Sequence, residues 1–403
     1  MKMTCFAIGL FVASAVSAQQ QRFDDVVRNL RNPDPKVRLS AVRLLRDAKY
    51  PESIAPMAPL VLDPIDDVQL EAIAAELSFF LEQDVKTTKM VGFVIEKRKS
   101  AIAAAAFDLG PLAVWPRPAP AELVTALLQA LDDETPKVRL EAIYAVGVIA
   151  KAPLPADQVQ RLTKALDHYD PAVRGAAARV IGRLRTAEAG DALIKAVNDS
   201  RADVRYAAMR ALGAIREARA AGALTEQFAF YKKGEGAWSA LDALAQIGAP
   251  GSVPLFRERL QDKDPYIRRA ATEGLGRAGD VESIDTLEKT VTTDDSPMVR
   301  LAAAFALQKL GRNYAARLVD LMSSPKVLTQ GQEYLIELGP SIAPTVAPRI
   351  QEPNPDVREA LIDVLGVIGN ESTLPLLQAA TTDADASVVA AAKRATARLQ
   401  APK

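Results

Sequence analysis

The chain is poor in the side chains that bind transition metals and act as nucleophiles. Among its 403 residues there are one cysteine and one histidine. Cys5 lies in an N-terminal segment that we expect to be removed, so the mature chain can form neither a disulfide nor a Cys/His zinc site. A Ser-His-Asp triad would need His168, which lies in a predicted turn beside a helix cap and is better explained as a solvated or capping residue. We therefore expect no enzyme activity, no cofactor and no metal.

The sequence also lacks an excess of charge of either sign. Lys and Arg number 50 and so do Asp and Glu, and removal of Lys2 with the N-terminal segment leaves 49 against 50. A neutral surface does not favour nucleic acid as a partner. Aromatic residues make up 5% of the chain, whereas apolar residues as a whole make up 49%. This composition is typical of closely packed helices with small side chains.

A long apolar run occurs once, at the N-terminus. Lys2 precedes an apolar stretch over residues 6–16, and Val16, Ser17 and Ala18 form a small-residue cleavage site. The pattern predicts a secretory signal peptide over residues 1–18. The alternative, a buried or transmembrane helix, is disfavoured because a membrane span needs about 20 apolar residues. We expect a secreted or periplasmic chain, residues 19–403, with no membrane span after removal of the signal.

Residues 170–197 contain a unit that recurs along the chain. Asp170 is a helix N-cap by type, and Pro171 suits the first helical position. The apolar residues that follow at helical spacing are Val173, Ala176, Ala177, Val180, Ile181 and Leu184. A second apolar stripe over residues 189–197 completes a helical hairpin. A single hairpin cannot cover its own apolar face, so the unit has to repeat.

Copies of this unit recur with a step of roughly 30 residues, the spacing of helix-hairpin repeats. Clear copies begin at residues 34–38, 135–139, 170–174, 202–205, 264–268, 296–300 and 354–358, and weaker ones surround Val68, Arg98, Gly236, Val327 and Val388. The pattern predicts an all-α solenoid (superhelix) of about twelve stacked hairpins, irregular at residues 79–120.

Glycines support the register. Gly147, Gly182, Gly213, Gly276 and Gly366 each lie nine residues after the Val or Ile of their copy, where a neighbouring helix can approach closely. Gly279, Gly311 and Gly369 lie twelve residues after it, where a helix-ending residue with positive φ is expected.

The pattern Asp-Pro-x-Val-Arg-x-x-Ala-Ala-x-x-Leu-Gly, as in residues 264–278, resembles the HEAT repeat, in particular the short HEAT-like class of the phycobilin lyases. The resemblance covers nearly all of residues 22–400. It implies a solenoid whose Val-Arg helices line the inner face and which serves as a binding surface. It also leaves open an alternative, an enzyme or cofactor carrier related to the lyases, with a ligand site on the inner face.

One arginine recurs in each clear copy and forms a predicted ladder along one face. Its members are Arg38, Arg139, Arg174, Arg205, Arg268, Arg300 and Arg358. Free guanidinium groups at this spacing could bind carboxylates or phosphates. We favour the alternative that they are structural, paired with the capping aspartates Asp34, Asp170, Asp203 and Asp264, which recur in step with them.

Departures from the repeat are the better candidates for a binding site, because the array does not need them. Residues 228–238 combine aromatic and basic side chains around a glycine turn, and Trp115 lies in a proline-rich stretch. The candidate partner-binding residues are Phe228, Phe230, Tyr231, Lys232, Lys233, Trp238 and Trp115. The alternative is that these aromatics fill wider gaps between helices. Our hypothesis is an exported, non-catalytic scaffold or adaptor whose partners are other proteins.

Overall fold

The computed structural model describes residues 23–81, 102–323 and 325–401. These residues form α-helices and short 3₁₀ turns, and an isolated bridge joins Leu81 to Val114. The predicted all-α helical-repeat class is confirmed. The predicted signal segment and the weak copy around Arg98 lie outside the described residues. The chain divides into two compact units: residues 1–114 with 118–150, and residues 115–117 with 151–403.

Unit 1 holds the helices up to α7. Residues 23–29 are helical and are followed by α2 (Pro35–Ala48), η1 (Pro51–Ser53), α3 (Ile54–Met57), η2 (Ala58–Leu62), α4 (Asp66–Phe80), α5 (Ile102–Asp108), η3 (Pro111–Ala113), α6 (Ala121–Gln129), η4 (Ala130–Asp132) and α7 (Pro136–Ile149). Helix α4 packs against α7. Gln69 of α4 donates a hydrogen bond to Asp133, just before α7, at 2.9 Å.

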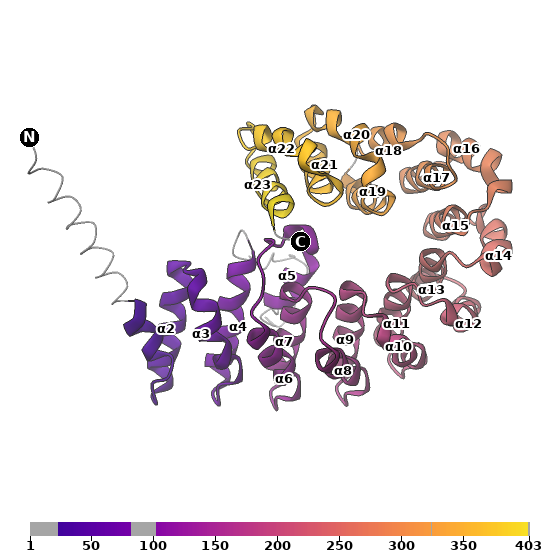
Figure 1. Cartoon of the computed structure of the whole chain (residues 1–403). Coiled ribbons are helices and arrows are strands. Elements are labelled where there is room, and N and C mark those ends of the chain that lie inside the picture. The colour runs from indigo at the N-terminus through magenta and orange to yellow at the C-terminus, as the bar shows by residue number, and fades with distance from the viewer. Residues whose placement is uncertain (1–22, 82–101, 324, 402–403) are drawn as a thin grey trace, which may run out of the picture. The chain divides into compact units, whose positions relative to one another are not determined.

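Unit 2 is a regular series of hairpins, each made of a shorter first helix and a longer second helix (Figure 1). The first helices are α8 (Ala156–Lys164), α10 (Gly190–Ala196), α12 (Ala221–Tyr231), α14 (Val253–Arg259), α16 (Ile284–Thr293), α18 (Ala315–Leu321), α20 (Ala343–Val346) and α22 (Leu374–Ala380). The second helices are α9 (Pro171–Leu184), α11 (Ala202–Ala214), α13 (Gly234–Ile247), α15 (Pro265–Ala278), α17 (Pro297–Lys309), α19 (Pro325–Leu338), α21 (Pro355–Ile368) and α23 (Ala386–Gln400).

Short 3₁₀ turns in unit 2 extend or lead into the first helices. They are η5 (Ala165–Asp167), η6 (Ala187–Ala189), η7 (Ala218–Ala220), η8 (Pro250–Ser252), η9 (Val281–Ser283), η10 (Pro340–Ile342), η11 (Ala347–Gln351) and η12 (Glu371–Thr373).

The second helices of unit 2 pack against one another in sequence order and form one row, which we call the inner row. The first helices all lie along one face of this row (Figure 1). Arg216, two residues after the end of α11, donates to Glu337 of α19 at 3.1 Å. Helices α13, α15 and α17 lie between α11 and α19 in the row. The row therefore curves toward the face on which Arg216 and Glu337 meet.

The inner-row helices α9 and α15 begin at the N-caps that the sequence predicts. The side chain of Asp170 accepts a hydrogen bond from the backbone N–H of Ala172 at 2.9 Å, and that of Asp264 accepts from Tyr266 at 2.9 Å. Proline occupies the first helical position after both caps. Each such cap stabilises its helix by about 1 kcal/mol.

Close packing in the inner row depends on glycine. A methyl group at Gly276 would lie 2.5 Å from Cα of Ala306 in the next helix, so the predicted close approach is confirmed there. The prediction for the helix ends was wrong at Gly369, which has φ −73° rather than a positive value. Its N–H still bonds to the carbonyl of Leu365 at 2.8 Å, and the chain leaves the helix in an extended conformation.

Candidate functional site

Arginine side chains link successive hairpins along the edge where the two helices of each hairpin are joined, which we call the ladder edge. In Arg174 of α9, Nη1 donates to the carbonyls of His168 and Tyr169 at 2.8 and 3.2 Å. Its Nε and Nη2 donate to the two carboxylate oxygens of Asp199, in the next hairpin, at 2.7 and 2.9 Å. Both sides of the guanidinium are held, so its orientation is defined.

The same geometry recurs at other positions of the ladder. Each aspartate also accepts the backbone N–H two residues further on, as Asp199 does from Arg201 at 2.8 Å. The hydrogen bond from Arg174 is the main cause that lowers the pKa of Asp199. The equivalent pairs are Arg38–Asp63, with N–O distances of 2.6 and 2.8 Å, Arg268–Asp294, with 2.9 and 3.0 Å, and Arg358–Asp383, with 3.1 and 2.8 Å.

These arginines do not pair with the aspartates predicted from the sequence, so that prediction was wrong. Asp34, Asp170 and Asp264 cap their own helices by accepting from the backbone N–H two residues on. Asp203 is exposed and lies 3.5 Å from Arg201. The aspartates that bind the ladder lie five residues before the Val of the next hairpin, because that turn position stacks beside the arginine of the preceding hairpin.

The ladder changes at hairpin α12/α13. Tyr231 occupies the position that holds aspartate in Asp63, Asp199 and Asp294, and Nε of Arg205 donates to its hydroxyl at 2.6 Å. Ala237 occupies the position of the ladder arginine. Residues 228–238, which the sequence predicts to depart from the repeat, lie in a regular hairpin in which both ladder residues are replaced.

Two of the predicted binding residues hold this hairpin in place. The ring of Tyr231 covers Gly236, where any side chain would overlap with it. Nε1 of Trp238 donates to the carboxylate of Asp264 in the next hairpin at 2.7 Å. The indole also lies against Tyr266, with ring centroids 4.5 Å apart and an interplanar angle of 30°. Tyr231 and Trp238 are half-buried and bridge neighbouring hairpins.

The other predicted binding residues are placed differently from one another. Phe228 is buried, with the guanidinium of Arg259 5.5 Å from its ring centroid. Lys232 and Lys233 are exposed in the turn between α12 and α13. Trp115, half-buried in the segment that leads to α6, makes no ring contact with these residues in the part of the chain that the structure describes.

The exposed aromatic residues of the described chain all lie at the ladder edge of unit 2. They are Tyr169, Phe230 and Tyr266, whose exposed fractions are 76%, 70% and 41%, and we call them the aromatic edge. The other described aromatic side chains are buried or half-buried. Phe230 is one of the predicted binding residues, whereas Tyr169 and Tyr266 are not. The sequence feature that could have identified Tyr169 and Tyr266 is their position in the repeat, because both lie within the turn that begins an inner-row helix.

The inner side of α13 to α19 is occupied by the protein's own charged side chains. Arg269 joins Asp242 and Glu273 at 2.6 and 2.8 Å, and Arg277 joins Glu273 and Glu337 at 2.8 and 2.9 Å. Glu273 is 4% exposed. It also accepts a hydrogen bond from Tyr334 of α19, and burial raises the pKa of that tyrosine.

The hydroxyl contact between Tyr334 and Glu273 joins α19 to α15 across the intervening α17. The network therefore ties three hairpins together on the side where the resemblance placed a ligand. We assign it a structural role, because its arginines and carboxylates pair with one another.

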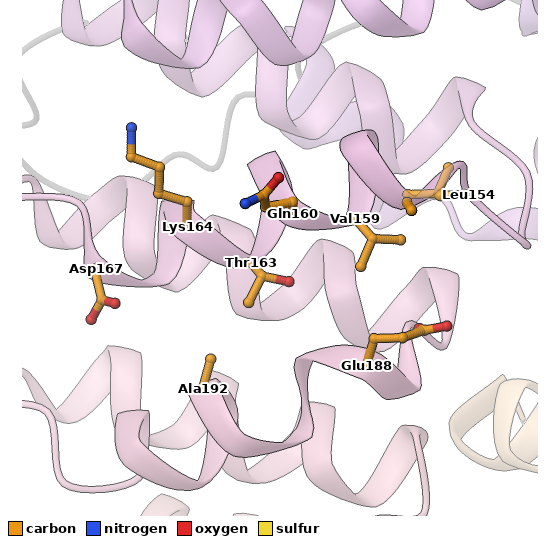
Figure 2. A pocket seen from close by; sticks show the side chains of 9 residues that line it. Leu154, Val159, Gln160, Thr163, Lys164, Asp167, Glu188 and Ala192 are labelled. Atoms are coloured by element: carbon orange, nitrogen blue, oxygen red, sulfur yellow. The ribbon is translucent and has the colours of Figure 1, made fainter.

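A shallow groove of about 590 Å³ lies between the first helices α8 and α10 (Figure 2). Val159, Thr163 and Lys164 line one side, and Glu188 and Ala192 line the other. Asp167, at one end of the groove, pairs with Lys195 at 2.6 Å. The groove is open and presents few converging polar groups.

Side chains that could form a metal site do not gather in the described chain. No group of three or more His, Cys, Asp or Glu residues lies together there in a way that could hold a metal ion. Nδ1 of His168 accepts the backbone N–H of Asp170 at 3.0 Å, so this nitrogen is part of the turn before α9. None of the described helices has the length and apolar character required to cross a membrane.

Comparison with known proteins agrees with the repeat architecture. The chain matches the HEAT repeats family over residues 159–229, 234–308 and 316–403, and a further HEAT repeat over residues 123–152. These matches cover more than half of the chain, and the chain belongs to the HEAT repeat family. No curated protein matches it.

Solved structures with a similar arrangement share little sequence with the chain. An engineered protein has 19% identity and a TM-score of 0.41, with 94% of this chain and 99% of that chain covered. The CpcE–CpcF complex of phycocyanin lyase from Nostoc sp. has 20% identity and a TM-score of 0.37, with 74% and 92% covered. The karyopherin Kap121p, bound to the C-terminus of the phosphatase Cdc14p, has 13% identity and a TM-score of 0.36, with 94% and 45% covered.

Proposed function

We propose that the chain is an exported, non-catalytic scaffold that binds another protein at the aromatic edge of unit 2. The observation that carries the proposal is the exposure of Tyr169, Phe230 and Tyr266 along one edge, because the other described aromatics are buried or half-buried. Exposed aromatic side chains beside charged ones are enriched in protein interfaces and contribute much of their binding energy.

The charged residues at this edge also support its assignment as the binding surface. Lys232 and Lys233 are exposed next to Phe230. Several ladder arginines are neutralised by aspartates, so they add little net charge here. The surface therefore favours a partner segment with apolar side chains and some acidic ones.

The test uses the mature full-length chain with exposed residues changed. The chain captures its partner from an extracytoplasmic fraction, the partner is identified by mass spectrometry, and its Kd is then measured by calorimetry. We expect the double variant Phe230→Ser, Tyr266→Ser to raise the Kd at least about tenfold, because each anchor in an interface contributes on the order of 1–2 kcal/mol.

A matched control changes two exposed apolar residues away from this edge, Val281→Ser and Val367→Ser. Both are exposed, at 63% and 42%. Equal Kd values for the two double variants would place the interface elsewhere. A metal or chromophore bound stoichiometrically to the purified chain would favour the alternative of a cofactor carrier. Export is tested separately by N-terminal sequencing of the mature chain, where we expect residue 19 first.

A further inference from the structure

Arg300 of α17 has the same internal anchor as the paired ladder arginines. Its Nη1 donates to the carbonyls of Asp294 and Asp295, at 2.6 and 3.3 Å. In Arg268, one hairpin earlier, Nη1 donates to the carbonyls of Asp262 and Lys263 at 2.8 and 3.2 Å. The guanidinium of Arg300 is therefore held in the ladder orientation by its own hairpin.

The next hairpin does not supply the carboxylate that this orientation serves. The position five residues before Val327 is Met322, which is fully buried. No described residue accepts a hydrogen bond from Nε or Nη2 of Arg300, which is half-buried at the ladder edge. In Arg174 these two atoms hold a carboxylate at 2.7 and 2.9 Å.

We propose that Nε and Nη2 of Arg300 form a binding site for a carboxylate, supplied by an acidic side chain of the protein partner. Two parallel N–H donors with fixed direction match the two oxygens of a carboxylate. Fixing the guanidinium beforehand also lowers the conformational entropy lost when the ligand binds.

The surroundings fit an acidic group. Asp294, the nearest acid of the same turn, is already paired with Arg268. The side chain of Asp295 is exposed, where water and salt screen its charge. Arg300 lies one inner-row helix beyond Tyr266, and neighbouring packed helices are about 8–10 Å apart. An extended segment that covers the aromatic edge can therefore reach this site. The identification of the ligand as an acidic side chain of the protein partner rests on the proposed function.

The first experiment needs no partner. The full-length chain, labelled with ¹⁵N at arginine Nε, is titrated with N-acetylglutamate amide, which presents a side-chain carboxylate, and with N-acetylglycine, which presents a terminal one. We expect the Nε–H signal of Arg300 to shift and saturate at millimolar N-acetylglutamate amide. The signal of Arg268, already paired, should stay in place.

A variant without the two parallel N–H donors of the guanidinium provides the control. Arg300→Lys keeps the positive charge but not the two parallel donors, and a thermal melt monitored by circular dichroism shows whether it folds. We expect its Kd for the captured partner to be about tenfold higher than that of the unchanged chain. No saturable shift at Arg300, or saturation by N-acetylglycine alone, would overturn the proposal.

The two proposals can fail independently. If Phe230→Ser, Tyr266→Ser leaves the Kd unchanged while Arg300 still saturates, the aromatic edge is wrong and the carboxylate site stands. If Arg300→Lys leaves the Kd for the partner unchanged while the double variant weakens binding, the partner's acid does not occupy this site and only the proposed function stands.

Discussion

The guanidinium of Arg174 and the carboxylate of Asp199 are joined by two hydrogen bonds between consecutive hairpins, and both side chains are largely buried, with exposed fractions of 14% and 11%. Removing one partner leaves the other charge in a poorly solvated position. We expect Asp199→Ala to lower the free energy of unfolding by about 3 kcal/mol, measured by urea denaturation.

The matched control for this pair is Asp167→Ala. Asp167 pairs with Lys195 at the surface, with exposed fractions of 63% and 74%. Water solvates both charges there, so we expect a loss below about 1 kcal/mol. Equal losses in the two variants would mean that the ladder contributes no more than an ordinary surface ion pair.

Acid should weaken the ladder. The pKa of Asp199 is lowered from 3.8, chiefly by the hydrogen bond from Arg174. A carboxylate with a lower pKa in the folded state stabilises the fold above its unfolded pKa, and this contribution is lost as the pH falls through the folded pKa. We expect the stability difference between the unchanged chain and Asp199→Asn to be constant between pH 7 and the unfolded pKa and to shrink as the pH falls below 3.8. A difference that stays constant below this pH would contradict the pairing.

Glu76 should make the stability of the fold depend on pH with the opposite sign. Its carboxylate in α4 is fully buried and accepts no hydrogen bond from the described residues, and burial raises its pKa well above 4.5. The folded chain keeps a proton that the unfolded chain releases, so stability falls as the pH rises above 4.5. We expect Glu76→Gln to raise the melting temperature at pH 8 and to change it little at pH 4.5. A variant that is less stable at both values would indicate that Glu76 has a favourable partner.

Gly276 tests the close packing of the inner row. Alanine has the higher helix propensity, by about 1 kcal/mol, but its methyl group would lie 2.5 Å from Cα of Ala306. Because this neighbour is backbone, the helices have to separate, and we expect Gly276→Ala to cost about 1–3 kcal/mol. Gly251→Ala is the control, since a methyl group there meets nothing within 4 Å, and it should be neutral or slightly stabilising. Both are measured by urea unfolding.

The structure changes the choice of residues for a binding test. Tyr231 and Trp238 are the prominent aromatics of residues 228–238, yet both form hydrogen bonds to neighbouring hairpins. Changing them would alter the stacking of hairpins as well as any binding. Phe230 is 70% exposed, so its replacement reports on the surface. Tyr266 is 41% exposed but also lies against Trp238, so a thermal melt has to show that the double variant keeps its fold.

Sequence alone could predict the hairpins because their signals are local. Caps such as Asp170, proline at the first helical position and the apolar stripe after Val173 act within one helix or between adjacent helices. The repeat period then predicts stacking, since each hairpin must cover the apolar face of its neighbour. Glycine at position 276 even indicated where two helices touch.

What the sequence determined by itself is therefore the all-α repeat architecture and its register. Only the tertiary structure decided that Arg174 binds Asp199 rather than the capping Asp170, that Tyr231 replaces an aspartate, and that Nε and Nη2 of Arg300 bind no acid among the described residues. These relationships join residues of different hairpins. They depend on the rise and rotation between repeats, which the pattern within any one hairpin does not specify.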